Sequence, residues 1–250
     1  MSKTKKRVYK TQVGKIPKIV DNFEPKTENQ KLFHQMISNF DNQLILCHGI
    51  AGTGKTYVSV YKALQDVLRR GTPYEKIIII NPTVDVGNED KLGFLPGELS
   101  AKIQQYNEST FTILDKIIGR SRAGKMINDN KIEIGVLNFL RGTNLENCYV
   151  ILDEAQNVSP MQIKTLMTRI SKNCKMIIQG DMSQCDKYKT NGVTNYSKSG
   201  FYDVWFRLKG VRGVDHMAFN RDDCIRHDLV KRILKTYEDE HEIDLNTKTN

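Results

Sequence analysis

The sequence lacks the features that mark membrane, secreted and simple zinc-binding proteins. It has no apolar run of about 18 residues and no signal peptide, so neither a membrane span nor secretion is expected. Its five cysteines include no C-x-x-C pair, which favours reduced thiols in a cytoplasmic protein over a disulfide framework. The five histidines are scattered without metal-ligand spacing, so a metal held by protein side chains alone is not expected.

Acidic residues are absent from the first twenty positions, which therefore carry +7 of the formal net charge of +9. We expect residues 1–24 to form a flexible basic arm, and residues 239–250 to form a polar, acidic tail. The arm either docks on nucleic acid by releasing counterions or only keeps the chain in solution. The seven basic residues concerned are Lys3, Lys5, Lys6, Arg7, Lys10, Lys15 and Lys18.

What the sequence does contain is a phosphate-binding loop. Residues 49–56 read GIAGTGKT and fit G-x-x-x-x-G-K-[ST] at every fixed position. Glycines let the backbone N–H groups turn toward phosphate, Lys55 brings a positive charge to the β- and γ-phosphates, and Thr56 offers a hydroxyl to Mg²⁺. A buried strand over 43–47 and a helix over 57–68 supply the expected context. The candidate nucleotide contacts here are Gly49, Ile50, Ala51, Gly52, Thr53, Gly54, Lys55, Thr56 and Tyr57.

A second motif ends an apolar strand in paired acids. Residues 149–154 read YVILDE, about 100 positions after the phosphate-binding loop. Asp153 at the strand end is placed to hold the water shell of Mg²⁺, and Glu154 to orient and deprotonate an attacking water. Together with the loop, this pair predicts hydrolysis of a phosphoanhydride.

Three further features of the sequence each have two interpretations. A helix is expected to start at Thr27, and Gln30 either completes its capping box or bonds an adenine edge. Gln184 follows a strand and is either a sensor of the γ-phosphate or a turn residue. The apolar loop 92–97 (LGFLPG) either covers its own domain or contacts a subunit or nucleic-acid strand.

The expected elements support an α/β fold. The first helix would turn five apolar residues to the core: Leu32, Phe33, Met36, Ile37 and Phe40. Strands are expected over 76–80, 131–137, 175–179 and 214–219, and helices over 109–118, 159–170, 200–208 and 223–237, with a basic turn at 120–125. The strand over 76–80 (KIIII) has the composition of a central parallel strand covered on both faces.

Taken together, these motifs resemble the PhoH family of P-loop ATPases, whose core is similar to that of superfamily 1 helicases. The resemblance runs over roughly residues 27–237 and rests on GIAGTGKT, LGFLPGEL, LRGTNLENCYVILDEAQN, MQIKTLMTRI, QGDMSQCD, KSGF and CIRHDLVKRILKTYE. It implies a single RecA-like P-loop NTPase domain over residues 25–238, with a mostly parallel central sheet and helices on both faces.

The resemblance also assigns roles to individual residues. Gln30 would be the adenine-side glutamine, Asp153 and Glu154 the Walker B pair, and Gln184 the γ-phosphate sensor, with Lys55 and Thr56 binding phosphate and Mg²⁺. The family usually has an arginine at position 81, where this chain has Asn81, and it usually reads RGRTL where residues 141–145 of this chain read RGTNL, so that the second arginine of that segment is missing. Inter-subunit or RNA roles of those two arginines therefore do not carry over.

The length suggests how such a site would be completed. About 210 residues hold one RecA-like domain, and a lone domain leaves the γ-phosphate exposed. We therefore expect a head-to-tail homo-oligomer, a hexameric ring being favoured, in which a neighbour supplies an arginine. The candidates are Arg226, Arg169 and Arg141, in that order, and each has a surface salt bridge as its alternative role.

The functional hypothesis is Mg²⁺-dependent ATP hydrolysis coupled to remodelling of single-stranded RNA or DNA. The alternative is an ATP-dependent switch that docks on a protein partner in RNA metabolism or the phosphate-stress response. A small-molecule kinase lacks support, because the acceptor-binding lid with clustered arginines is not seen. Longer PhoH proteins carry a PIN-type ribonuclease domain, for which residues 1–42 leave no room, so nuclease activity is not expected.

Overall fold

The computed structural model describes residues 19–82, 107–135, 137, 144–185, 189–190, 193–194 and 198–238. Most of the expected basic arm, the LGFLPG loop, Arg141 and the acidic tail lie outside these residues. None of the described helices is both long and apolar enough to cross a membrane.

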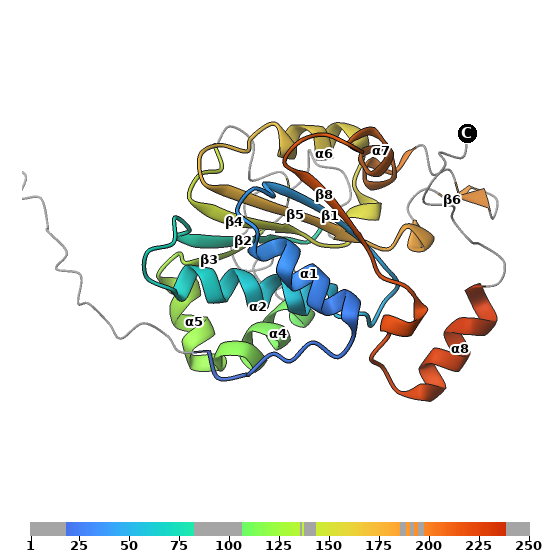
Figure 1. Ribbon diagram of the computed structural model, residues 1–250, viewed down its shortest axis with the longest axis horizontal. Coiled ribbons are helices and arrows are strands. Elements are labelled where there is room, and N and C mark those ends of the chain that lie inside the picture. Colours follow the sequence, from blue (N-terminus) through green and yellow to red (C-terminus); the bar gives the residue numbers. More distant parts are fainter. Residues whose placement is uncertain are drawn as a thin grey trace, which may run out of the picture.

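A six-stranded sheet organises the described part of the chain (Figure 1). Its strand order is β3-β2-β4-β5-β1-β8, and every pairing in it is parallel. A parallel sheet is stable when both faces are covered, which explains the uninterrupted apolar runs of its central strands. The strands are β1 (Leu44–His48), β2 (Lys76–Ile80), β3 (Ile132–Gly135), β4 (Cys148–Leu152), β5 (Cys174–Gly180) and β8 (Val214–Ala218).

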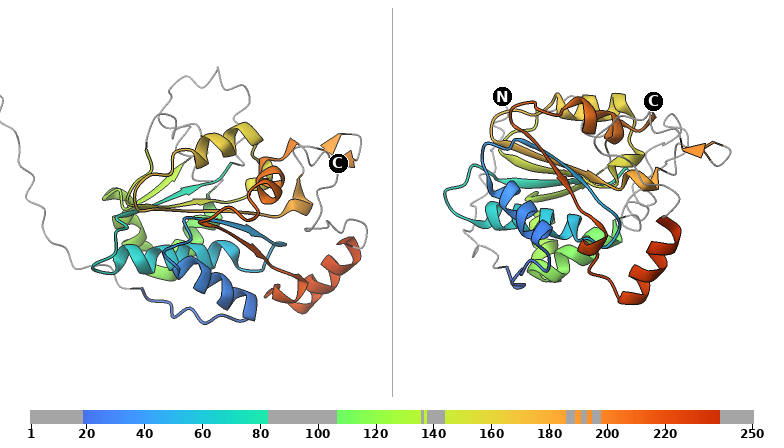
Figure 2. Two further views of the ribbon diagram at one scale, coloured as in Figure 1. Left: turned by 45° about the horizontal axis from the view of Figure 1, so that its top comes forward. Right: turned by 45° about the vertical axis from the view of Figure 1, so that its right-hand side comes forward.

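Helices cover both faces of this sheet (Figure 2). One face carries α1 (Glu28–Ser38), α2 (Lys55–Leu68), α4 (Glu108–Ile118) and α5 (Arg120–Asn128). The other carries α6 (Pro160–Met167) and α7 (Gly200–Arg207), and each face has its own buried apolar cluster. The expected single α/β domain with a RecA-like parallel sheet is confirmed.

Two smaller parts lie outside these layers. A two-stranded antiparallel ribbon pairs β6 (Lys189–Thr190) with β7 (Val193–Thr194). Helix α8 (Asp228–Glu238) stands beyond the end of β8, away from the sheet (Figure 1). Its exposed side chains include Leu229 and Ile233.

Three local predictions were wrong. Residues 120–125 are not a turn, because Gly119 adopts φ +82° between two helices and α5 then buries Ala123 and Met126. Leu32 and Phe40 do not face the core and are 50% and 59% exposed. Helix α8 starts at Asp228 instead of residue 223, so Arg226 precedes it.

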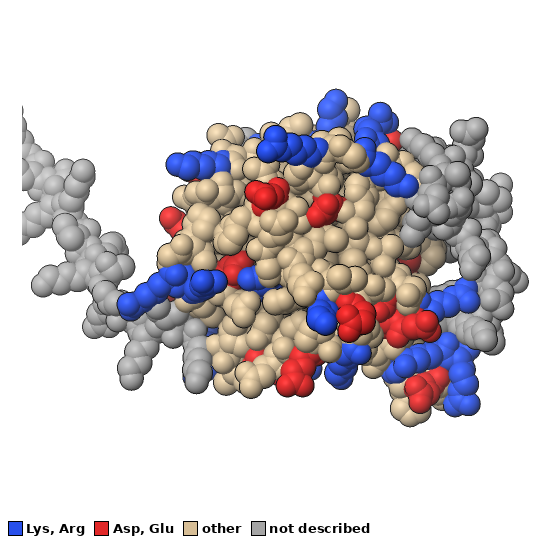
Figure 3. Space-filling model, viewed as in Figure 1, with Lys and Arg blue, Asp and Glu red and all other residues tan. Residues whose placement is uncertain are grey.

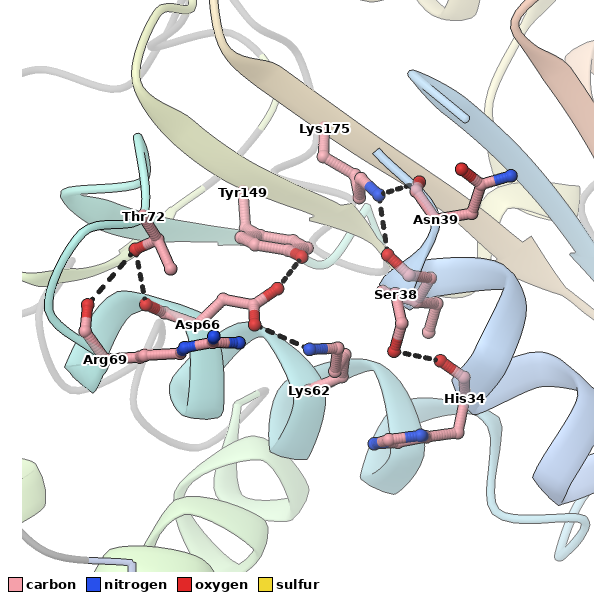
Figure 4. A network of polar contacts seen from close by, with 10 residues as sticks. His34, Ser38, Asn39, Lys62, Asp66, Arg69, Thr72, Tyr149 and Lys175 are labelled. Atoms are coloured by element: carbon pink, nitrogen blue, oxygen red, sulfur yellow. Dashed lines mark hydrogen bonds and ion pairs between the residues drawn. The ribbon is translucent and has the colours of Figure 1, made fainter. Parts of the chain in front are cut away.

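A buried polar network ties α1 and α2 to the sheet at the amino ends of its strands (Figure 4). Asp66 forms an ion pair of 2.5 Å with Lys62 through Oδ1, and its Oδ2 accepts a hydrogen bond from the Tyr149 hydroxyl. Lys175, on β5, donates from Nζ to the carbonyl oxygens of Ile37 and Asn39, each at 2.6 Å, at the end of α1. Buried ion-pair and hydrogen-bond interactions of charged side chains therefore connect the helices to the sheet at the edge opposite the phosphate-binding loop.

The network predicts that stability depends on pH. Burial lowers the pKa of Lys175 to about 8. Above pH 8 the folded chain has lost the proton of Lys175, whereas the unfolded chain keeps it up to the ordinary lysine pKa of 10.5. The unfolded chain therefore binds more protons than the folded chain in this range, and the free energy of unfolding should rise by about 2 kcal/mol between pH 8 and 9.5. Urea unfolding at several pH values measures this, with Lys175→Met as the comparison. An equal pH dependence of both proteins in this range would contradict the prediction.

Candidate nucleotide-binding site

The phosphate-binding loop connects β1 to α2 at the carboxyl end of the sheet. Gly52 and Gly54 have φ of +88° and +86°, a region in which glycine pays no steric penalty. Gly54 is also the N-cap of α2 and makes no side-chain capping bond, so the first N–H groups of the helix face the loop. Such a helix start with its dipole is suited to bind an anion.

Lys55 lies inside this loop. Its side chain is buried, and Nζ donates to the carbonyl oxygens of Gly49 and Ile50, the latter at 3.0 Å. The N–H of Gly49 in turn donates to the carbonyl oxygen of Gly180 at 3.1 Å, which fixes the start of the loop to β5. The expected phosphate-binding ammonium is thus held inside the loop by the backbone carbonyls of its first two residues.

The two expected metal ligands, Thr56 and Asp153, are in direct contact at the carboxyl end of the sheet. The Thr56 hydroxyl donates to Asp153 Oδ2 at 2.8 Å, although the residues come from α2 and the end of β4. Gln179 Nε2 lies 3.1 Å from both Thr56 Oγ1 and Asp153 Oδ1, and its Oε1 accepts from Ser59 Oγ at 2.7 Å. Strand β5 lies between β1 and β4, which puts Gln179 between the loop and the acids.

This donor set fits Mg²⁺. A hydroxyl and a carboxylate are hard oxygen ligands, and Mg²⁺ is usually held by one or two such groups together with phosphate oxygens and water. Among the described residues, no group of three or more His, Cys, Asp or Glu side chains is arranged to hold a metal. The ion would therefore depend on the nucleotide for its remaining ligands.

Glu154 lies beside Asp153 in a strained backbone conformation. Its φ is +49°, in the left-handed region that costs energy for a residue other than glycine. Its Oε2 accepts a hydrogen bond from Gln156 Nε2 at 2.6 Å. Burial and the neighbouring Asp153 carboxylate raise the pKa of Glu154, which makes its carboxylate a better proton acceptor.

Gln156 connects the acids to the end of β5. Its side chain is buried, and Oε1 accepts from the N–H of Asp181 at 3.1 Å. Asp181 Oδ1 accepts from the N–H and hydroxyl of Ser183, whereas Asp181 Oδ2 is buried without a partner among the described residues. Burial lowers the pKa of nearby His48 to about 4, against the opposing charge of Asp181, so the imidazole is neutral at pH 7.

Gly180 permits this close contact. A Cβ atom at residue 180 would lie 2.3 Å from Gln156 Oε1 and 3.1 Å from the Ala155 nitrogen. We expect Gly180→Ala to destabilise the protein by about 1–3 kcal/mol and to displace Glu154, which would lower turnover. Urea unfolding and an ATP turnover assay measure the two effects.

Gly124→Ala is the matched control, because a Cβ on Gly124 of α5 meets nothing within 4 Å. Alanine is the better helix former, so the control should be as stable as the wild type or more so. Equal stabilities of Gly180→Ala and the wild type would contradict the close packing.

The side chain of Gln30 contacts the backbone of the loop. The Thr27 hydroxyl accepts from the Gln30 N–H at 3.2 Å, so Thr27 is the N-cap of α1 as predicted. The Gln30 side chain does not complete a capping box: Nε2 donates to the carbonyl oxygen of Thr53 at 2.9 Å, and Oε1 accepts from the Lys26 N–H at 2.8 Å. Its adenine contact stays a prediction.

Arg226 lies against the loop of its own chain. A Cβ on Gly52 would come within 2.8 Å of the Arg226 side chain, and the Ile225 N–H donates to the Gly52 carbonyl oxygen at 3.0 Å. Arg169 is not part of this site, because its carbonyl oxygen bonds the N–H of Leu145 before β4, at the opposite sheet edge. The supply of an arginine by a neighbour stays a prediction.

Gln184 ends a short 3₁₀ helix, Met182–Gln184, that follows β5, and the residue is exposed. Its role as γ-phosphate sensor also stays a prediction. The sequence reasoning missed Gln179, Ser59 and Gln156. A glutamine ending the apolar run of β5 was the available indication, since a buried amide needs partners.

The fold and this site define a P-loop nucleotide-binding protein with a RecA-like core. Residues 22–238 match the model of the family described as PhoH-like protein. The chain therefore belongs to the PhoH family, as the motifs predicted.

Three bacterial relatives show the extent of the similarity. The chain is 37% identical over 213 residues to a PhoH-like protein of Synechocystis sp.. The matched segment covers 85% of this chain and 61% of the relative. It is 40% identical over 197 residues to a PhoH-like protein of Bacillus subtilis, with 79% and 59% covered. It is 33% identical over 211 residues to Protein PhoH of Escherichia coli, with 84% and 57% covered. The chain thus spans about three fifths of the length of these relatives.

Proposed function

We propose that this chain binds ATP with Mg²⁺, hydrolyses it, and uses the cycle to remodel single-stranded RNA or DNA. The observation that carries the proposal is the bond from the Thr56 hydroxyl to Asp153 Oδ2, together with Glu154, the next residue, whose pKa is raised by burial and by the nearby charge of Asp153. A P-loop alone supports only nucleotide binding, whereas a hydroxyl, a metal-binding acid and a second acid form a hydrolytic site.

Each residue then has a separate task. The backbone N–H groups of the loop and Lys55 would bind the phosphates, and Thr56 and Asp153 would hold the metal. Mg²⁺, when bound, offsets the negative charge that develops on the phosphate oxygens. Glu154 orients the attacking water and accepts its proton, which the raised pKa favours.

An arginine is still needed at the γ-phosphate, and two sources are proposed. Arg226 is near the loop of its own chain and would act within one subunit. A neighbour in a head-to-tail ring, which we favour as a hexamer, would supply Arg169 or Arg141 instead. Either source would stabilise the transition-state charge.

Charge supports the nucleic-acid part of the proposal. Basic side chains gather around α8 (Figure 3), where Arg226, Lys231 and Arg232 are exposed. The seven basic residues of the first twenty positions add to this charge. Lysine and arginine that contact phosphates release counterions, which gives binding that weakens with salt.

A nucleotide-dependent switch is the second candidate. Helix α8 exposes Leu229 and Ile233, and Ile225, just before it, is 43% exposed. Because the Ile225 N–H is bonded to the Gly52 carbonyl oxygen, the loop and the start of this apolar face are close in space. A protein partner would dock there without any motor activity.

One experiment tests the proposal. ATP turnover is measured with and without single-stranded RNA or DNA at two salt concentrations, alongside molar mass by light scattering, with Lys55→Ala as the inactive control. We expect a ring-sized mass and stimulation by nucleic acid that weakens at the higher salt. If the protein is a monomer and its ATP turnover does not change with nucleic acid, the proposals of nucleic-acid remodelling and of a ring are both wrong. The nucleotide-dependent switch would then be the remaining candidate.

A further inference from the structure

Gln179 is a fully buried amide in the centre of the site. It lies near the carboxyl end of β5, between the strand that precedes the P-loop and the strand that ends in the acids, and its exposed fraction is 0%. Three of its neighbours are polar: Ser59 on α2, Thr56 at the start of α2 and Asp153 after β4. Both expected metal ligands are therefore within reach of one side chain.

The orientation of this amide follows from its partners. The Ser59 hydroxyl donates to Gln179 Oε1 at 2.7 Å, which turns the NH₂ group toward Thr56 and Asp153. The two hydrogens of that group match two acceptors, Thr56 Oγ1 and Asp153 Oδ1, each at 3.1 Å. The flipped amide would set its oxygen against the Asp153 carboxylate, which is unfavourable.

The remaining bonds leave room for a metal. Thr56 Oγ1 donates its hydrogen to Asp153 Oδ2 and accepts one from Gln179, so one lone pair stays available. Asp153 Oδ1 also accepts from the Glu154 N–H at 3.0 Å. Among the described residues, the hydrogen bonds that hold both ligands thus come from neutral donors, the Gln179 amide and the Glu154 N–H.

We propose that Gln179 is a positioning residue for the metal of the nucleotide complex, and that Ser59 orients it. The amide holds the hydroxyl of Thr56 and the carboxylate of Asp153 in the arrangement that Mg²⁺ requires. This rests on the proposed function, because it assumes that the metal binds with the nucleotide. Loss of such outer partners typically weakens metal binding by about 10–100-fold.

The experiment separates metal binding from nucleotide binding and from turnover. A fluorescent ADP is titrated onto the whole chain in EDTA, and Mg²⁺ is then titrated into the complex. For Gln179→Met, which keeps the size but removes both donors, we expect a Mg²⁺ midpoint about 10–100-fold higher and an ADP affinity in EDTA within about twofold of wild type. Ser59→Ala should shift the Mg²⁺ midpoint in the same direction by less.

Asn42→Leu is the matched control for a lost buried amide. Asn42 is 8% exposed, donates to the Met36 carbonyl oxygen at 3.1 Å, and precedes β1 at the opposite sheet edge. It should lower stability without moving the Mg²⁺ midpoint. A purely structural role of Gln179 would give the same result as this control.

The outcomes separate the two proposals. If the ADP affinity of the wild type does not change with the Mg²⁺ concentration, the result would count against the proposed function itself. A wild type that responds to Mg²⁺, with Gln179→Met responding equally, would overturn only the positioning role. If Gln179→Met does not fold, Ser59→Ala decides, and an unchanged Mg²⁺ midpoint in that variant would overturn the assignment.

Discussion

Glu154→Gln is expected to lower ATP turnover by about 10²–10⁴-fold while ATP affinity stays within a few-fold of wild type. The Gln156 amide donates to the side chain of residue 154, and a glutamine oxygen can also accept that bond, although more weakly than a carboxylate. The substitution therefore keeps the size of the side chain and an acceptor for Gln156, and removes the negative charge and the ability to take a proton from water. Turnover is measured by phosphate release, and affinity with a fluorescent nucleotide.

Two comparisons make this result specific. Lys55→Ala should lose nucleotide affinity as well as turnover, because its ammonium lies inside the phosphate-binding loop. In Asp153→Asn, nucleotide affinity should no longer depend on Mg²⁺, since Asp153 bonds the Thr56 hydroxyl and is the second expected metal ligand. Turnover by Glu154→Gln within about tenfold of wild type would show that another group accepts the proton.

Asp66→Ala should reduce the free energy of unfolding by about 3–5 kcal/mol. Asp66 is 3% exposed and is the partner of both Lys62 and the Tyr149 hydroxyl, so its removal leaves a buried ammonium and a buried donor unpaired. Burial also raises the pKa of Tyr149, so the phenol stays a donor and cannot neutralise Lys62. Urea unfolding at pH 7 measures the change.

The surface pair between Asp203 and Arg207 provides the control. It joins an aspartate and a cation at 2.8 Å on α7, but the Arg207 side chain is 65% exposed. Asp203→Ala should therefore cost no more than about 1 kcal/mol. If Asp66→Ala costs no more than that, the buried network contributes little to stability.

The parts of the site that were predicted from sequence are those in which neighbouring residues act together. The glycines, lysine and threonine of the P-loop act as one loop, and Asp153 and Glu154 end one strand. Strand β2 (Lys76–Ile80) was predicted with its observed bounds, because five consecutive residues of that composition suit a strand covered on both faces.

The parts that were missed depend on tertiary structure. Gln179 becomes a partner of Thr56 only because β5 lies between β1 and β4, and strand order is not contained in a local pattern. Arg226 was predicted as a site residue supplied by a neighbour, but its position near Gly52 of its own chain was not predicted, because it depends on the bond between the turn after β8 and the P-loop. Helix α5 was taken for a turn because its burial of Ala123 and Met126 depends on packing beside α4.

The position of β5 also determines when the site can form. The P-loop and the paired acids follow strands β1 and β4, which are not neighbours in the sheet, and β5 comes later in the chain than both. These contacts join residues far apart in sequence, which makes them slow to form during folding. A nascent chain that ends before Cys174 already contains both nucleotide motifs, yet it lacks the strand that sets their spacing. Under the proposed function, the site for Mg²⁺ and nucleotide would thus form only when the centre of the sheet is complete.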